Sequence, residues 1–340
     1  MSITQAMALS GVLASGASGG GPTWTSTIRT DFASSTYDSV TKTIVGPTGT
    51  YDASLSQQTQ SPIGLNADGT KLFTVGNGNL PINEFTLSTA YDLSTAGTGT
   101  YTGVDVETDY SLNINAEGGF FTDNGNKLII TNNESVSQYS LSTAYDAGSV
   151  SAHDGTTKRN GSSPYLNFND TFPGNSWRFT PGPYVNYLVS DPAGKYFYVI
   201  AFRDATLECW QADTTGSLIG GCTFVDSLSL GYEVQNNGVD MRITPDGLNI
   251  VIQVWDGNNA NPHDIRLVEL GPGGVCTGAT LNSTTVSPNY TPSNGGSSFP
   301  RGCLLVPMAN GDLVFWTFHY TGIVTSIEGF RTTLGTWSDP

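Results

Sequence analysis

The chain repeats one pattern of apolar and polar positions, in which two short runs rich in apolar and β-branched residues flank a glycine-containing turn. Such runs predict β-hairpins, because β-branched and aromatic residues suit a pleated sheet and glycine supplies the turn geometry. The turn glycines are Gly69, Gly125, Gly194, Gly247 and Gly311. They lie 56, 69, 53 and 64 residues apart, which is room for one four-stranded antiparallel sheet with its loops.

A second repeat links the outer strands of these units. Residues 82–92, Ile-Asn-Glu-Phe-Thr-Leu-Ser-Thr-Ala-Tyr-Asp, recur at 136–146 as Val-Ser-Gln-Tyr-Ser-Leu-Ser-Thr-Ala-Tyr-Asp, and residues 32–38 are a weaker copy. In a functional interpretation, Tyr91 and Tyr145 present ring faces to a sugar. In a structural one, the motif closes the outer strand pair, Asp92 and Asp146 cap backbone amides, and the tyrosine packs beside the sheet. Repetition at corresponding positions favours the structural interpretation.

Repeated four-stranded sheets of this length predict an all-β fold, a β-propeller with four-stranded antiparallel blades. We expect five blades, with six as the alternative if residues 147–191 form an extra one. Residues 24–45 are expected to complete the last blade and close the ring, although residues 322–330 already resemble its third strand. Residues 1–22 are predicted to be a short flexible or assembly-bound N-terminal arm, with a cleavable signal as the rival interpretation, and residues 23–340 the propeller domain.

Composition agrees with an all-β protein and excludes several partners. Charged residues are only 12% of the chain, while 15 Tyr, 15 Phe and 6 Trp are present. The 13 Lys and Arg are scattered against 29 Asp and Glu, giving a net charge of −16. Nucleic-acid binding and adhesion to an anionic membrane both require basic clusters, so neither is expected. No apolar run is long enough to cross a bilayer as a helix, so membrane insertion is not expected either.

The four cysteines leave their pairing open. Cys209 with Cys222, and Cys276 with Cys303, could face each other across hairpins, while buried free thiols are the favoured alternative. No CxxC pair occurs, and His153, His263 and His319 are not at ligand spacing from a cysteine. Calcium loops of the D-x-D-x-D type do not occur either. We therefore expect no metal and no cofactor.

Enzymatic chemistry is weakly indicated. Propeller glycosidases work with pairs of carboxylates, and the acidic residues considered are Asp105, Glu107, Asp109, Asp240 and Asp256. Nothing in the sequence separates a catalytic acid among them from a solvated loop residue. The Asp-Gly turns lack the tryptophan of the sialidase Asp box, and no G-x-S-x-G nucleophile elbow occurs. The sequence thus favours a non-enzymatic protein with no catalytic residues.

A ligand is most readily placed on the loops that follow the second strand of each unit, because these share one face of a propeller. Asn, Asp and aromatic residues gather in them, and such groups suit glycans, since rings stack on sugar faces and amides bond hydroxyls. The alternative is that Asn and Gly here only form turns. The candidate residues are Asn77, Asn79, Asn132, Asn133, Asp204, Trp255, Asp256, Asn258, Asn259, His319 and Tyr320.

The repeat resembles a known one. Residues 61–97, SPIGLNADGTKLFTVGNGNLPINEFTLSTAYDLSTAG, and the copy at 117–150 resemble a propeller repeat of structural proteins of tailed bacteriophages, especially marine ones, and of some secreted bacterial proteins. The resemblance implies a virion component, in the tail, a fibre or a head decoration.

That resemblance also implies partners. They would be other virion proteins, contacted through residues 1–22 or one propeller face, and a host-surface glycan, with homo-oligomers in the particle left open. The alternative is a secreted bacterial propeller lectin or glycosidase.

Overall fold

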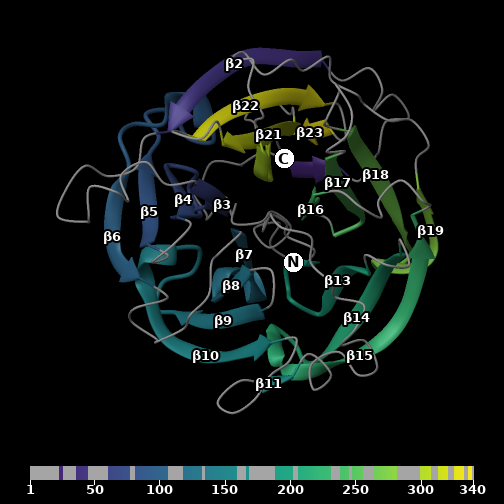
Figure 1. The fold of residues 1–340 in the computed structure, drawn as a ribbon. Coiled ribbons are helices and arrows are strands. Elements are labelled where there is room, and N and C mark those ends of the chain that lie inside the picture. Colours follow the sequence, from purple (N-terminus) through teal and green to yellow (C-terminus); the bar gives the residue numbers. More distant parts are fainter. Residues whose placement is uncertain are drawn as a thin grey trace.

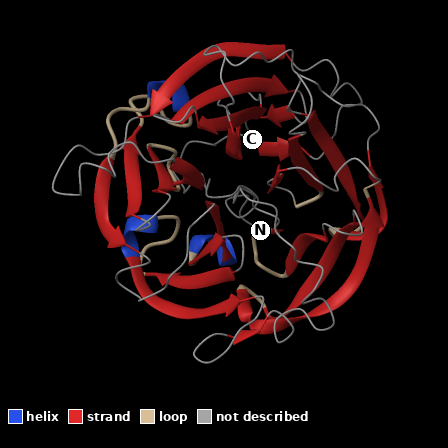
Figure 2. Cartoon of the chain, in the orientation of Figure 1, coloured by secondary structure: helices blue, strands red, loops and turns tan. Residues whose placement is uncertain are grey.

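The computed structural model describes the greater part of the chain as strands and tight turns around one centre. Its described residues are 23–25, 36–44, 60–76, 81–105, 118–131, 135–158, 166–167, 188–201, 206–230, 238–244, 247–255, 264–281, 299–307, 313–320, 325–332 and 336–338. Figure 2 shows that almost all of these residues are strand, with a few short 3-10 turns. The predicted all-β class is confirmed.

The strands form antiparallel sheets arranged as a ring, each with its first strand innermost (Figure 1). The β3–β6 sheet contains β3 (Gln60–Leu65), β4 (Lys71–Gly76), β5 (Pro81–Thr86) and β6 (Thr100–Asp105). The β7–β11 sheet contains β7 (Gly118–Thr122), β8 (Lys127–Thr131), β9 (Ser135–Leu141), β10 (Val150–Lys158) and β11 (Leu166–Asn167). The β12–β15 sheet contains β12 (Leu188–Ser190), β13 (Tyr196–Ala201), β14 (Thr206–Thr214) and β15 (Ser217–Ser229).

Two further sheets and one strand pair complete the ring. The β16–β19 sheet contains β16 (Gly238–Ile243), β17 (Asn249–Trp255), β18 (Asp264–Gly271) and β19 (Val275–Leu281). The closing sheet contains β20 (Phe299–Pro307), β21 (Leu313–Tyr320), β22 (Thr325–Thr332) and, from the other end of the chain, β2 (Thr36–Ile44). The short strands β1 (Thr23–Thr25) and β23 (Thr336–Ser338) pair separately.

The predicted blade number needs correction. Among the described residues, four sheets have the expected four antiparallel strands, so the four-stranded blades in this part of the chain number four, not five or six. The β7–β11 sheet differs because β11 adds to it in parallel, with Thr157 opposite Leu166. The unpaired edge of β10 offers hydrogen-bonding groups to such a segment. Among the described residues of the 147–191 interval, strands extend this sheet or begin the next, and none forms an extra blade.

The two chain ends share the closing sheet, as predicted. Strand β2 pairs antiparallel with β22, from Thr36 opposite Arg331 to Ile44 opposite Thr325. Strand β22 is third in its sheet and β2 is fourth, so the N-terminal copy is not redundant. Residues 1–22 lie outside the described residues, and the arm stays a prediction.

Apolar side chains fill the spaces between neighbouring sheets. Phe73 and Phe121, from adjacent sheets, meet edge to face with ring centroids 6.4 Å apart, and Phe121 meets Tyr145 at 5.6 Å. Second strands are apolar on both faces, as in Leu72, Phe73 and Val75, because each sheet is covered on both sides. Each such buried side chain contributes roughly 1.5–3 kcal/mol, so mutual burial is the main stabilising interaction of the ring.

The Tyr-Asp repeat is structural, as the favoured interpretation held. Tyr91 and Tyr145 adopt φ values of 64° and 60°, and their backbone N–H groups donate to the carbonyls of Gly69 (2.8 Å) and Gly125 (2.9 Å). Asp92 Oδ1 accepts from Ser94 N at 3.0 Å, and Asp146 Oδ1 accepts from Gly148 N at 3.0 Å. The turn between the third and fourth strands is thereby fastened to the glycine turn between the first and second.

The β12–β15 sheet makes the same contact with glycine in place of tyrosine. Gly216 has a φ of 81° and donates its N–H to the Gly194 carbonyl at 2.8 Å. In the β16–β19 sheet, Gly274 also has a left-handed φ, of 77°, and lies near the Gly247 carbonyl, but its N–H donates to the Gly271 carbonyl at 3.0 Å. Its own carbonyl accepts a hydrogen bond from the Tyr198 hydroxyl. Sequence reasoning missed these equivalents because the left-handed position, rather than the side chain, is what repeats.

All four cysteines are buried free thiols, as favoured. Pairing across the hairpins, the alternative, is wrong for a geometric reason. Cys209 lies opposite Asp226, whereas Cys222 lies opposite Ala212, and the two thiols belong to core clusters on opposite faces of their sheet. Cys276 packs toward the β12–β15 sheet, while Cys303 contacts Asp240 on the other side of the β16–β19 sheet.

In the described part of the chain, no helix has the length and apolar character needed to cross a membrane.

The turn contact predicts the effect of a single methyl group. At Gly125 (φ 84°) a Cβ would lie 2.2 Å from the Tyr145 ring, so Gly125→Ala should lower the free energy of unfolding by about 3 kcal/mol, from backbone strain plus overpacking. Gly103→Ala is the matched control, because Gly103 has a φ of 88° but no atom within 4 Å of its Cβ position. It should cost only about 1 kcal/mol. Denaturant unfolding measures the free energy of unfolding of both variants. Equal losses in the two variants would contradict a tight contact between Gly125 and the Tyr145 ring.

Candidate functional site

The predicted ligand residues fall at or beyond the ends of the second strands. Trp255 is the last residue of β17, and His319 and Tyr320 are the last two of β21. The other eight follow β4, β8, β13 or β17 in sequence and lie outside the described residues; they are Asn77, Asn79, Asn132, Asn133, Asp204, Asp256, Asn258 and Asn259. Their part in binding stays a prediction.

The strand order places these ends on one rim of the ring. Trp255 lies opposite Gly238, the first residue of β16, and Tyr320 lies opposite Phe299, the first residue of β20. Every sheet has the same alternation of strand direction, so the second strands all end beside the start of an inner strand. We call this edge the second-strand rim, and the opposite edge, with Gly69, Gly125, Gly194 and Gly247, the glycine-turn rim.

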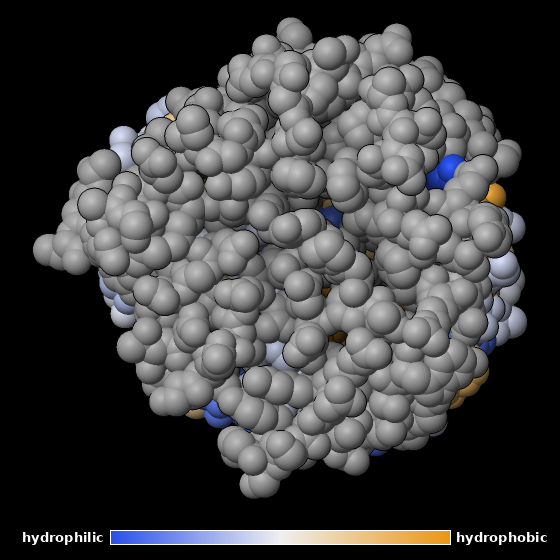
Figure 3. Space-filling model, in the orientation of Figure 1, coloured by the Kyte–Doolittle hydropathy of each residue, from blue (hydrophilic) through white to orange (hydrophobic). Residues whose placement is uncertain are grey.

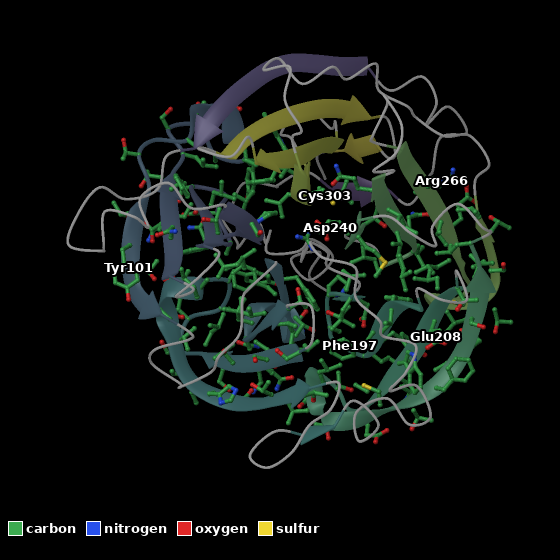
Figure 4. All side chains as sticks on the ribbon, viewed as in Figure 1. Tyr101, Phe197, Glu208, Asp240, Arg266 and Cys303 are labelled. Carbon is green, nitrogen blue, oxygen red and sulfur yellow. The ribbon has the colours of Figure 1, made fainter. Side chains whose placement is uncertain are left out.

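A buried polar cluster lies beneath the second-strand rim, where three inner strands converge. Asp240 and Gln253 are opposite each other, two residues below Gly238 and Trp255, or about 7 Å along the strand. In Figure 4, Asp240 and Cys303 lie close together near the centre of the ring. The cluster therefore lies between inner strands near the centre of the ring, below the rim that carries the predicted ligand residues.

Asp240 and Arg242 join neighbouring sheets. Asp240 accepts hydrogen bonds from the backbone N–H groups of Met241 (2.9 Å) and Cys303, and its Oδ1 lies 3.5 Å from Arg242 Nη1. Arg242, with no exposed surface, donates from Nε to the Cys303 carbonyl at 2.6 Å and from Nη2 to the Pro62 carbonyl at 3.5 Å. One side chain thus ties β16 to β20 and to β3.

Close packing fixes the cluster. A Cβ on Gly302 would lie 2.8 Å from the Pro62 ring and 3.0 Å from Asp240 Oδ2. Only glycine allows β20 to approach β3 and Asp240 this closely.

Burial raises the pKa of the Asp240 carboxyl, while Arg242 and the backbone N–H of Cys303 act in the opposite direction. Burial, together with the neighbouring Asp240, also raises the pKa of the Cys303 thiol. A carboxyl with a raised pKa can serve as a general acid. Here both carboxylate oxygens hold backbone amides, so Asp240 acts as an inter-sheet clamp.

The other acidic candidates form no group with it in the described structure. Asp105 ends β6, in a different sheet, and Glu107, Asp109 and Asp256 lie outside the described residues. In those parts of the chain with described positions, no three His, Cys, Asp or Glu side chains gather as a metal site.

Gln253, like Arg242, is a polar residue of this cluster that sequence reasoning missed. Its side chain is 1% exposed, and neither amide atom has a hydrogen-bond partner in the described structure. An unmet buried polar group costs about 1–3 kcal/mol, so the amide suits a ligand hydroxyl or a water molecule. The available signal was a single glutamine within the apolar run 250–255.

No family model matches this sequence, and no curated protein matches it. Several solved structures are similar at low identity. A protein from Lactobacillus plantarum is 13% identical, over 81% of this chain and 73% of that chain, with a TM-score of 0.39. The periplasmic gluconolactonase of Pseudomonas aeruginosa is 12% identical, over 82% and 72%, with a TM-score of 0.33.

A Trichoderma reesei protein of carbohydrate-active enzyme family AA12 is 13% identical, over 89% of this chain and 99% of that chain, with a TM-score of 0.42. Because these TM-scores are below 0.5, the similarities carry no argument about function.

Proposed function

We propose that the protein is a non-catalytic virion component of a tailed bacteriophage, which presents its second-strand rim to a host-surface glycan. The segments that carry the resemblance to phage propeller repeats, residues 61–97 and 117–150, contain the first three strands of two neighbouring sheets, β3–β5 and β7–β9. The matching residues therefore build the ring itself.

The commitment of carboxylates to the scaffold is the observation that carries the non-catalytic assignment. Asp154, for example, accepts from Lys127 (2.7 Å), Gln138 (2.8 Å) and Ser140 (2.7 Å). Burial would raise its pKa, but these hydrogen bonds outweigh burial and the pKa is lowered. Others that accept hydrogen bonds within the ring are Asp68, Asp92, Asp146, Asp191, Asp213, Asp226 and Asp240. These carboxylates stabilise turns and sheets, and their oxygens are already used as acceptors within the protein.

The glycine-turn rim is occupied by the protein's own contacts. Tyr91 and Tyr145 cover Gly69 and Gly125, and the hydroxyl of Tyr91 donates to the Ala67 carbonyl at 3.1 Å. Between sheets, the backbone N–H of Asn124 donates to the Pro192 carbonyl at 2.9 Å. Recognition is therefore better assigned to the second-strand rim.

The chemistry of the second-strand rim suits a polyhydroxylated ligand. Aromatic and amide residues are expected there from the sequence, and the Gln253 amide lies beneath them with its donor and acceptor unused by described residues. Sugar recognition uses this combination, in which rings cover the apolar sugar face and amides bond the hydroxyls.

The outer surface of the ring suits exposure on a particle. In Figure 3, the described residues along the edge of the ring are largely pale or blue. The large exposed hydrophobic residues among them are the neighbouring Phe224 and Val225, 47% and 38% exposed. A polar, acidic surface with a net charge of −16 resists nonspecific adhesion.

Glycan binding is tested with the purified full chain on an array of bacterial surface glycans. Trp255→Ala and Tyr320→Ala should each weaken binding by about tenfold, the contribution of one aromatic–sugar contact. Val225→Thr, on the outer edge of the ring, is the matched control and should bind as the unchanged protein does. Silence across all glycans, or equal binding by the rim variants, would remove the receptor role.

Virion incorporation is tested on purified phage particles. The protein should be detected in particles by mass spectrometry, and a chain lacking residues 1–22 should be depleted from them, while its purified form keeps the unfolding midpoint of the full chain. Incorporation of the truncated chain at normal occupancy would show that the arm is not the anchor. Absence of the full chain from particles would overturn the virion assignment.

A further inference from the structure

Two of the four buried thiols meet between neighbouring sheets. Cys209 of β14 and Cys276 of β19 belong to the same core cluster, between the β12–β15 and β16–β19 sheets, and are 0% and 3% exposed. Cys222 lies in the cluster on the opposite face of the β12–β15 sheet. The topology thus separates one thiol of this sheet from the pair.

Asp226 links the sheet that contains Cys209 to the strand that contains Cys276. It lies opposite Cys209 in the β14–β15 ladder, so both side chains leave the same face of the sheet. From there its carboxylate reaches the next sheet, where Oδ1 accepts from Cys276 N at 3.1 Å and Oδ2 accepts from the Thr277 backbone. The backbone of Cys276 is therefore fixed beside the strand position of Cys209.

The Cys276 thiol reaches the strand that carries Cys209. Cys276 Sγ donates to the Leu207 carbonyl at 3.6 Å, and Leu207 precedes Cys209 by two residues on the same face of β14. The pKa of the Cys276 thiol is raised, mainly by a hydrogen bond with the Cys209 thiol and secondly by burial. A raised pKa keeps the Cys276 thiol from forming the reactive thiolate, and both cysteines are buried, so the folded pair is slow to react and oxidation is expected while the chain folds.

We propose that Cys209 and Cys276 form an inter-sheet disulfide when the protein folds in an oxidising environment. The two thiols lose two protons and two electrons as the S–S bond forms. A small-molecule disulfide, such as oxidised glutathione, accepts the two electrons and the two protons. It reacts through a mixed disulfide with one cysteine and leaves as two thiols. The bond would join adjacent sheets covalently between cysteines that lie 67 positions apart in the sequence.

The test is refolding of the full chain in a buffer with excess oxidised glutathione, followed by alkylation and non-reducing peptide mapping. Peptides containing Cys209 and Cys276 should be linked, with Cys222 and Cys303 alkylated. Oxidised protein should unfold about 5 °C above reduced protein, because a cross-link over a loop of this length restricts the unfolded chain.

Matched variants separate the pair from general effects of oxidation. Cys222→Ser removes a buried thiol outside the pair and should keep the shift, whereas Cys209→Ser and Cys276→Ser should abolish it. The peptide map of the unchanged chain decides the matter even where a serine variant does not fold. Alkylation of both Cys209 and Cys276 after oxidative refolding, or linkage of any other pair, would overturn the proposal.

Discussion

Pairing between the two ends of the chain is the constraint on which the ring depends. Each sheet is apolar on both faces, so each must be covered by a neighbour on both sides. A row of such sheets has exposed faces at its two ends unless it closes on itself. Strand β2 makes the closure by adding to β22, which brings residues 36–44 beside residues 325–332. The inner strands then converge, and Arg242 can reach Cys303 and Pro62.

Local contacts keep the sheets uniform enough to pack in this way. A residue with left-handed geometry in the outer turn donates to a glycine in the inner turn, whether it is Tyr145 or Gly216. Carboxylates provide further ties, such as Asp226 between β15 and β19. These uses leave the second-strand rim, with the buried Gln253 amide beneath it, as the part of the ring best suited to a ligand.

Sequence reasoning predicted what depends on repeated local geometry. Glycine turns at regular spacing predicted the four-stranded sheets, and the Tyr-Asp copies predicted the outer turn with its capping aspartates. It did not predict β11, because a two-residue strand has no periodic pattern. Arg242 and the Cys209–Cys276 contact were missed because they join residues of different sheets, and their proximity depends on ring geometry. The binding role of the loops after the second strands also remains a prediction, because their irregular sequence has no repeated pattern from which their geometry could be inferred.

Ring closure is tested most directly by comparing two truncations with the full chain in denaturant unfolding. Removing residues 1–44 deletes β2 together with the short strand β1, and the account predicts that the free energy of unfolding falls by about 4 kcal/mol or more, at roughly 1 kcal/mol for each lost ladder hydrogen bond. Removing residues 1–22 keeps β1 and β2 and should leave stability unchanged within about 0.5 kcal/mol. Equal stability of the two truncated chains would contradict closure by β2.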